Sequence, residues 1–375
     1  MIRNFALAAA LIATAAIAPG VRAQDAPPPK WQGVWKGTIG TLPVQACFRR
    51  IGDSFERGAY FYLAGKRLIG LDFDRGSWVE KAAKGGGESG RWTIAVAADG
   101  AMRGEWAGGG KTLPVVLRRN GTADDQVEAC ASRTFIQPRL LPARVVASPA
   151  KVPGLAFTRL RYQAPPSFRE VDLQGFAYAP SEPGDKAILA ALKLQPDIAG
   201  GRGDYGACMQ GAIGMLGDDG DYTREVDPEW ATPAFLSVYD SEGGFCGGAH
   251  PSYGYVRELW DRQSGKRVDF ARWFTSAGID PDDRKYVSSI QELTPALRDV
   301  VVRHFITDQA ECKDAVADQE FWGIGLNPTG FVFTPSLPHV IMACVDDAQV
   351  PFAAVSRFLT PVGKAQLARL KAGRK

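Results

Sequence analysis

A train of short strand-like segments between Trp31 and Arg119 constrains the fold of this 375-residue chain more than any other feature. Turns rich in glycine and aspartate, such as Asp74-Arg75-Gly76, separate the segments. Evenly spaced short strands joined by such turns are typical of an antiparallel barrel or sandwich. We expect eight strands, at Val34–Ile39, Val44–Arg49, Ala59–Leu63, Leu68–Phe73, Trp78–Lys81, Trp92–Ala97, Met102–Trp106 and Leu113–Leu117.

Three tryptophans in this region, Trp78, Trp92 and Trp106, recur every 14 residues. A meander of hairpins with this repeat places one tryptophan from each hairpin on the same face of the sheet. We therefore expect the three indoles to lie side by side.

Six cysteines indicate disulfide bonds, because the count is even and the chain begins like an exported protein. Six cysteines allow 15 connectivities. We favour pairing between sequence neighbours, which keeps each bridge inside one candidate domain. There is no Cys-x-x-Cys motif, so neither a zinc knuckle nor a thioredoxin-type site is indicated. The expected pairs are Cys47–Cys130, Cys208–Cys246 and Cys312–Cys344.

Residues 1–23 have the pattern of a secretory signal peptide. Arg3 precedes an apolar run from Phe5 to Ala18, and small residues precede a cleavage point after Ala23. No later segment approaches the roughly 18 apolar residues of a membrane span. We expect a periplasmic or secreted protein without a membrane span in its mature form.

The charge balance argues against some partners. The formal net charge is +3, and removing Arg3 and Arg22 with the signal leaves about +1. A balance this even disfavours nucleic acid or an anionic membrane as the main partner.

A change in composition divides the chain. Residues 31–130 are the expected all-β domain, and residues 131–154 contain four prolines and form the expected linker. Residues 155–372 mix strands and helices without strict alternation, which is an α+β layout. Within them we expect helices at Gly184–Leu194, Asp282–Ile306 (with a break and a fresh cap at Thr294-Pro295) and Glu311–Phe321, and a strand at His339–Val345.

The segment Phe245–Pro251, with the sequence Phe-Cys-Gly-Gly-Ala-His-Pro, is the most distinctive motif of the second half. Adjacent glycines can adopt backbone angles that are unfavourable for other residues, and the ring of Pro251 fixes its own φ angle. A strand, a turn at Asp261–Lys266 and the pair Trp273-Phe274 follow. Together these features resemble the C-terminal domain of the RsiV/PdaC-like family of bacterial envelope proteins. The matching positions are Gly247, Gly248, His250, Pro251, Asp261, Gly265, Lys266, Trp273 and Phe274.

The resemblance implies a cell-envelope module that recognises a lysozyme-like protein or peptidoglycan. Some members of that family form the extracellular part of an anti-sigma factor that binds lysozyme, and others accompany a peptidoglycan deacetylase domain. This sequence shows no deacetylase domain with metal-binding histidines, so deacetylation is not implied. The expected binding residues are Gly247, Gly248, His250, Tyr253, Tyr255 and Asp261.

Catalytic templates are absent from the sequence: it contains no nucleophile elbow, metalloprotease helix, phosphate-binding loop or dinucleotide fingerprint. We expect no cofactor and no metal site. Among the three histidines, His304 and His339 fit structural positions, whereas His250 either locks the bend around it or presents its ring to a partner.

Three interpretations of function remain. The first is a non-enzymatic binding protein of the cell envelope. The second is a hydrolase or modifying enzyme of cell-wall glycan that uses the carboxylates Glu258 and Asp261, or Asp240 and Glu242, as an acid–base pair. The third is a structural envelope protein whose partner is not defined by its sequence.

Overall fold

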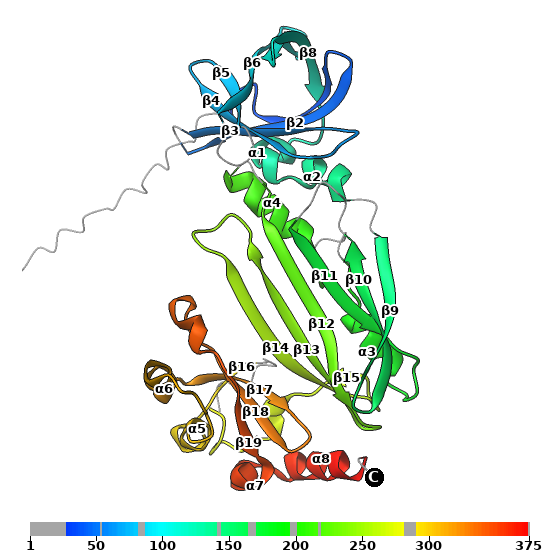
Figure 1. Cartoon of the computed structure of the whole chain (residues 1–375), viewed down its shortest axis with the longest axis vertical. Coiled ribbons are helices and arrows are strands. Elements are labelled where there is room, and N and C mark those ends of the chain that lie inside the picture. The colour runs from blue at the N-terminus through cyan, green and yellow to red at the C-terminus, as the bar shows by residue number, and fades with distance from the viewer. Residues whose placement is uncertain are drawn as a thin grey trace, which may run out of the picture.

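The chain folds into a β barrel, a long seven-stranded sheet and a smaller four-stranded sheet, which follow one another from top to bottom in Figure 1. The architecture is α+β, as predicted. The expected signal segment lies outside the described residues. The computed structural model describes residues 28–52, 55–81, 87–140, 144–163, 170–195, 201–216, 219–280 and 290–373.

The N-terminal barrel is closed, because β1 pairs with both β2 and β8. This decides between the barrel and the sandwich that the sequence left open. All eight predicted strands are present, with small shifts at their ends. They are β1 (Gly33–Ile39), β2 (Leu42–Ile51), β3 (Phe55–Tyr62), β4 (Ile69–Asp74), β5 (Ser77–Lys81), β6 (Glu88–Val96), β7 (Met102–Gly108) and β8 (Lys111–Arg119).

The expected row of tryptophans is confirmed. Trp78 lies opposite Trp92, and Trp92 lies opposite Trp106, so the three indoles share one face of the barrel wall. Between them lies the buried carboxylate of Glu80, which accepts hydrogen bonds from Tyr60 Oη (2.6 Å), Trp92 Nε1 (2.9 Å) and Trp106 Nε1 (2.5 Å). The barrel interior is therefore a packed core organised around one polar group.

The central sheet has the strand order β15-β14-β13-β12-β11-β10-β9 and is antiparallel except between β11 and β12. Its long middle strands run the full height of the sheet in Figure 1. The strands are β9 (Arg144–Val152), β10 (Leu155–Gln163), β11 (Val171–Ala177), β12 (Asp221–Ala231), β13 (Phe235–Phe245), β14 (Ser252–Asp261) and β15 (Lys266–Arg267).

The predicted linker at 131–154 contains regular structure. Helix α2 (Arg133–Leu140) and strand β9 occupy much of it. β9 pairs along its whole length with β10 and is the edge of the sheet, a position where a proline such as Pro149 is tolerated. The segment that its prolines indicated as a linker therefore contains a helix and a paired edge strand.

Short helices join the barrel to the sheet. In Figure 1, α4 lies between the barrel and the top of the sheet. Residues from both units form one hydrophobic cluster, among them Val34, Cys47, Phe61, Phe135, Tyr162, Leu173, Met209 and Ile213. The helices of this region are α1 (Asp124–Val127), η1 (Ala129–Ala131), α2 and α4 (Tyr205–Leu216), whereas α3 (Asp185–Leu192) lies at the other end of the sheet (Figure 1).

The C-terminal part forms a four-stranded antiparallel sheet, ordered β16-β17-β18-β19. Its elements are η2 (Phe270–Arg272), β16 (Ile290–Glu292), α5 (Pro295–Val302), α6 (Ala310–Ala317), β17 (Phe321–Leu326), β18 (Gly330–Pro335), η4 (His339–Cys344), β19 (Ala348–Pro351), α7 (Phe352–Val355), η5 (Ser356–Phe358) and α8 (Pro361–Ala372).

Two predictions about this part need correction, and one is confirmed. Residues 282–289 of the helix expected at Asp282–Ile306 lie outside the described residues, and its next residues form the strand β16. The predicted strand His339–Val345 is instead the short helix η4. The expected fresh start at Thr294-Pro295 is confirmed, because Thr294 caps α5 by accepting a hydrogen bond from Leu297 N.

All three expected disulfides are present: Cys47–Cys130, Cys208–Cys246 and Cys312–Cys344. Within the part of the chain that the structure describes, no helix has the length and apolar character needed to span a lipid bilayer.

Candidate functional site

The loop between β13 and β14 carries the Gly-Gly-Ala-His-Pro motif and is fastened to helix α4. The Cys208–Cys246 disulfide forms one attachment. The other is Gly247, whose φ of +91° favours glycine and whose missing Cβ would lie 2.8 Å from the carbonyl oxygen of Gly211. Gly248 is exposed and its Cβ position is almost free of contacts. Of the two predicted glycines, Gly247 therefore has a structural role in docking the loop.

The loop presents His250 to solvent, where its ring stacks on that of His339. The ring centroids are 4.4 Å apart and the planes differ by 6°. His250 Nδ1 lies 2.9 Å from the carbonyl oxygen of Pro251. His339 begins η4 and is also exposed. The sequence pointed to His250 but placed His339 in a structural strand, because residues so far apart carry no local signal of contact.

An open groove of about 200 Å³ runs between β14 and the four-stranded sheet. Tyr253, which is 59% exposed, lies along one side, and its ring covers Gly243 on the neighbouring strand, where a Cβ would come within 2.6 Å of the ring. Most of the lining is apolar or aromatic. The lining residues are Tyr253, Gly254, Tyr255, Ile290, Gly323, Thr334, Pro335, Ser336, Leu337, Met342 and Val345.

Arg257 contacts Tyr255, one of the residues that line this groove. It forms ion pairs with Glu229 (2.9 Å) and with Asp347 (2.8 Å), and its guanidinium lies over the ring of Tyr255. Burial and the negative charge of Asp347 raise the pKa of Tyr255 to about 12, although Arg257 acts in the opposite direction. The Tyr255 hydroxyl therefore keeps its proton at neutral pH.

Asp261 lies at the other end of β14, roughly 30 Å from the loop at the usual rise of a strand. Its Oδ1 accepts hydrogen bonds from Gln263 N and Ser264 N (both 2.9 Å), and its Oδ2 accepts one from Arg369 (2.6 Å) in α8. The structure thus groups His250, Tyr253 and Tyr255, and it separates Asp261 from them.

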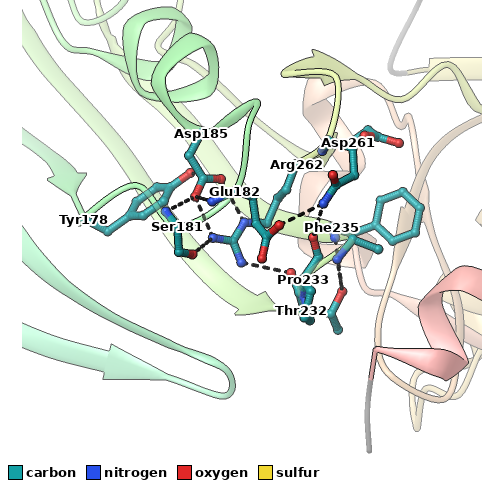
Figure 2. Close-up of polar contacts among 11 residues, drawn as sticks. Tyr178, Ser181, Glu182, Asp185, Thr232, Pro233, Phe235, Asp261 and Arg262 are labelled. Carbon is teal, nitrogen blue, oxygen red and sulfur yellow. Dashed lines mark hydrogen bonds and ion pairs between the residues drawn. The ribbon is translucent and has the colours of Figure 1, made fainter.

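Next to Asp261, the turn is held against α3 by a buried ion pair (Figure 2). Arg262 donates from Nε and Nη2 to the two oxygens of Asp185, at 2.9 and 2.7 Å. Burial alone would raise the pKa of Asp185, but Arg262 and the backbone N–H groups of Ser181 and Glu182 outweigh it and lower that pKa to about 2. These hydrogen bonds give the network a structural role, which is to hold the turn against α3.

The four carboxylates considered for glycan hydrolysis are each paired with arginine. A retaining or inverting glycosidase needs one carboxylic acid with a raised pKa and a free position beside the substrate. The pKa of Asp261 is instead lowered: burial raises it, but the hydrogen bond and charge of Arg369 and the backbone N–H groups of Ser264 and Gln263 together outweigh burial. The pairs are Glu258 with Arg267 (3.2 Å), Asp261 with Arg369 (2.6 Å), Asp240 with Arg224 (2.7 Å) and Glu242 with Arg224.

Comparisons with known proteins give matches among solved structures only. No protein-family model matches the chain, and no curated protein matches it. One similar solved structure is a DUF3298 family protein from Pseudomonas aeruginosa, with 12% identity, a TM-score of 0.34, and coverage of 59% of this chain and 95% of that one. Another is a DUF3298 family member from Bacteroides fragilis, with 11% identity, a TM-score of 0.39, and coverage of 62% and 98%.

Proposed function

We propose that this chain is a non-enzymatic binding protein of the bacterial cell envelope, and that the groove beside β14 is its binding surface. The observation that supports this proposal is the open, largely apolar groove, which has the exposed Tyr253 on one side. Exposed aromatic and apolar side chains around a concave surface are typical of interaction sites. The three disulfides are compatible with a periplasmic or secreted location.

A protein partner fits the groove better than a glycan does. Glycan sites combine a stacking aromatic ring with many polar groups that hydrogen-bond to hydroxyls, whereas Ile290, Leu337, Met342 and Val345 give this groove few such groups. Aromatic residues and methionine are enriched at protein interfaces. The resemblance of the Phe245–Pro251 motif to the RsiV/PdaC-like family suggests a lysozyme-like protein as the partner.

The test is binding of residues 24–375 to immobilised lysozyme, measured by interferometry in the presence of EDTA. We expect saturable binding that Tyr253→Ala weakens by about 2 kcal/mol, or roughly 30-fold, as for an interface hot spot. Phe55→Ala is the matched control, because Phe55 is 50% exposed on the barrel, away from the groove. Equal weakening by both substitutions, or no binding to a panel of lysozymes, would contradict the proposal; retention on purified peptidoglycan would then favour the glycan as ligand.

The second candidate, a glycan hydrolase, makes a different prediction. Such an enzyme releases soluble fragments when it is incubated with purified cell-wall sacculi. Because each candidate carboxylate has an arginine partner, we expect no release. If the protein releases fragments and Glu258→Gln abolishes this release, the glycan hydrolase becomes the better supported function.

A further inference from the structure

His250 and His339 form an exposed, stacked pair of imidazole rings. They are two of the three histidines in the chain, and the fold brings them together from separate elements with parallel, exposed rings. Each ring also stands on a segment that a disulfide holds. Cys246, bonded to Cys208, lies in the loop before His250, and Cys344, bonded to Cys312, ends the short helix that His339 begins.

The hydrogen bond of His250 selects its tautomer. The carbonyl oxygen of Pro251 can only accept, so Nδ1 of His250 carries a proton when it makes this 2.9 Å contact. In the neutral ring the lone pair then lies on Nε2. Metal-binding histidines typically show this arrangement, in which one ring N–H donates to a carbonyl and the other nitrogen is left to bind the ion.

We propose that His250 and His339 form a two-histidine site for a divalent transition-metal ion such as zinc or copper(II). Neutral imidazole is a good ligand for these ions, with metal–nitrogen distances of about 2.0–2.1 Å for zinc. Two ligands at that distance in tetrahedral geometry place their nitrogens about 3.3 Å apart. In the structure the two ring planes are parallel and stacked, and one ion cannot lie in both planes. Binding therefore requires the two exposed side chains to rotate until one nitrogen of each ring points at the ion.

The site is open to solvent or to a partner. Among the described residues no three histidine, cysteine or acidic side chains are grouped to hold an ion, so the remaining coordination positions take water or a donor from a bound molecule. A bound ion would join the β13–β14 loop to η4 and thereby connect the two sides of the fold beside the groove. Disulfides already hold the backbone of both segments, so binding of an ion has to order little more than the two histidine side chains.

The test is titration of residues 24–375, without a histidine tag, with zinc chloride by calorimetry and with copper(II) by electron paramagnetic resonance. We expect one equivalent to bind, with nitrogen couplings from two imidazoles. His250→Gln and His339→Gln should each weaken binding by about tenfold or more. His304→Gln is the control, because the His304 ring contacts the carbonyl of Val300 within α5 and its turn.

Two results would overturn the site. One is the absence of binding by the unsubstituted chain. The other is equal binding by the His250→Gln/His339→Gln double variant, with its fold verified by circular dichroism. Both readouts are independent of lysozyme, so this inference and the proposed function can fail separately.

Discussion

Arg262 and Asp185, separated by 77 residues in sequence, form a two-pronged ion pair in which both side chains are buried. The guanidinium also donates to the carbonyl of Thr232 and to Ser181 Oγ, and Tyr178 donates to the carboxylate (Figure 2). Asp185 thus accepts hydrogen bonds from Arg262, from Tyr178 and from the backbone N–H groups of residues 181 and 182, and this network ties the β14–β15 turn to the start of α3.

Removing one partner of this pair should destabilise the protein strongly. Asp185→Asn leaves Arg262 buried without a counter-charge, and we expect a loss of about 3–5 kcal/mol in the free energy of unfolding. Urea denaturation at pH 7 measures it. Asp172→Asn is the control, because the Asp172–Arg161 pair is exposed and its loss should cost less than about 1 kcal/mol. Similar losses for the two variants would contradict this account.

The same pair predicts the response to acid. Folding lowers the pKa of Asp185 from 3.8 to about 2, so the folded state binds the proton less well than the unfolded state does. The stabilisation, about 2 kcal/mol, is complete above pH ~4 and is lost as the pH falls toward 2. The free energies of unfolding of the unsubstituted protein and of Asp185→Asn, measured from pH 6 to 2, should therefore converge as the pH falls. A constant difference between the two free energies across this pH range would show that the Asp185 carboxyl has the same pKa in the folded and unfolded states.

The two glycines of the Gly-Gly-Ala-His-Pro motif should respond differently to alanine. Gly247→Ala forces a side chain into a left-handed φ and toward the backbone of Gly211, and we expect a loss of about 2 kcal/mol or more. Gly248→Ala should change stability by less than about 0.5 kcal/mol, because its Cβ has space. Thermal unfolding of both variants provides the comparison, and a larger effect at Gly248 would refute the docking role of Gly247.

Glu80 should be essential to the barrel. Glu80→Ala leaves the donors of Tyr60, Trp92 and Trp106 without an acceptor in a buried site, which should cost about 3 kcal/mol or more. Tryptophan fluorescence during urea denaturation reports on this region directly. Glu105→Ala, on the exposed side of β7, should leave the transition nearly unchanged. An unaltered midpoint in Glu80→Ala would mean that water replaces the carboxylate at no cost.

Loss of the Cys208–Cys246 disulfide should destabilise the loop that carries His250. The bridge spans 38 residues, and closing a loop of that size restricts the unfolded chain by about 4 kcal/mol. We expect Cys208→Ser/Cys246→Ser to lower the free energy of unfolding by up to that amount. Amide hydrogen exchange should show the largest increase in the Phe245–Pro251 segment. Exchange that rises equally throughout the sheet would instead indicate global loosening.

Local patterns in the sequence predicted much of the fold correctly. The barrel strands, the row of Trp78, Trp92 and Trp106, and the cap at Thr294 each depend on residues a few positions apart or on a regular repeat. Such signals act through backbone preference and side-chain alternation, which are properties of short segments.

Secondary structure predicted from local sequence patterns was wrong where tertiary contacts outweigh the conformational preference of the residues. Local sequence patterns predicted no helix at α4, whose Gly211 and Gly214 are unfavourable inside a helix but allow close packing. A Cβ on Gly211 would lie 2.6 Å from the carbonyl oxygen of Cys246, and one on Gly214 would lie 2.9 Å from the side chain of Ala131. Contact with neighbouring elements therefore stabilises a helix that its composition disfavours.

The sequence by itself correctly predicted the three disulfide pairs and the eight strands of the first domain, because these follow from cysteine order and strand repeat. Only the tertiary structure decided that His339 joins His250 and that Asp261 does not. The physical reason is distance: an extended strand carries Asp261 away from a motif close to it in sequence, whereas packing of β14 against the C-terminal sheet brings a distant histidine into contact.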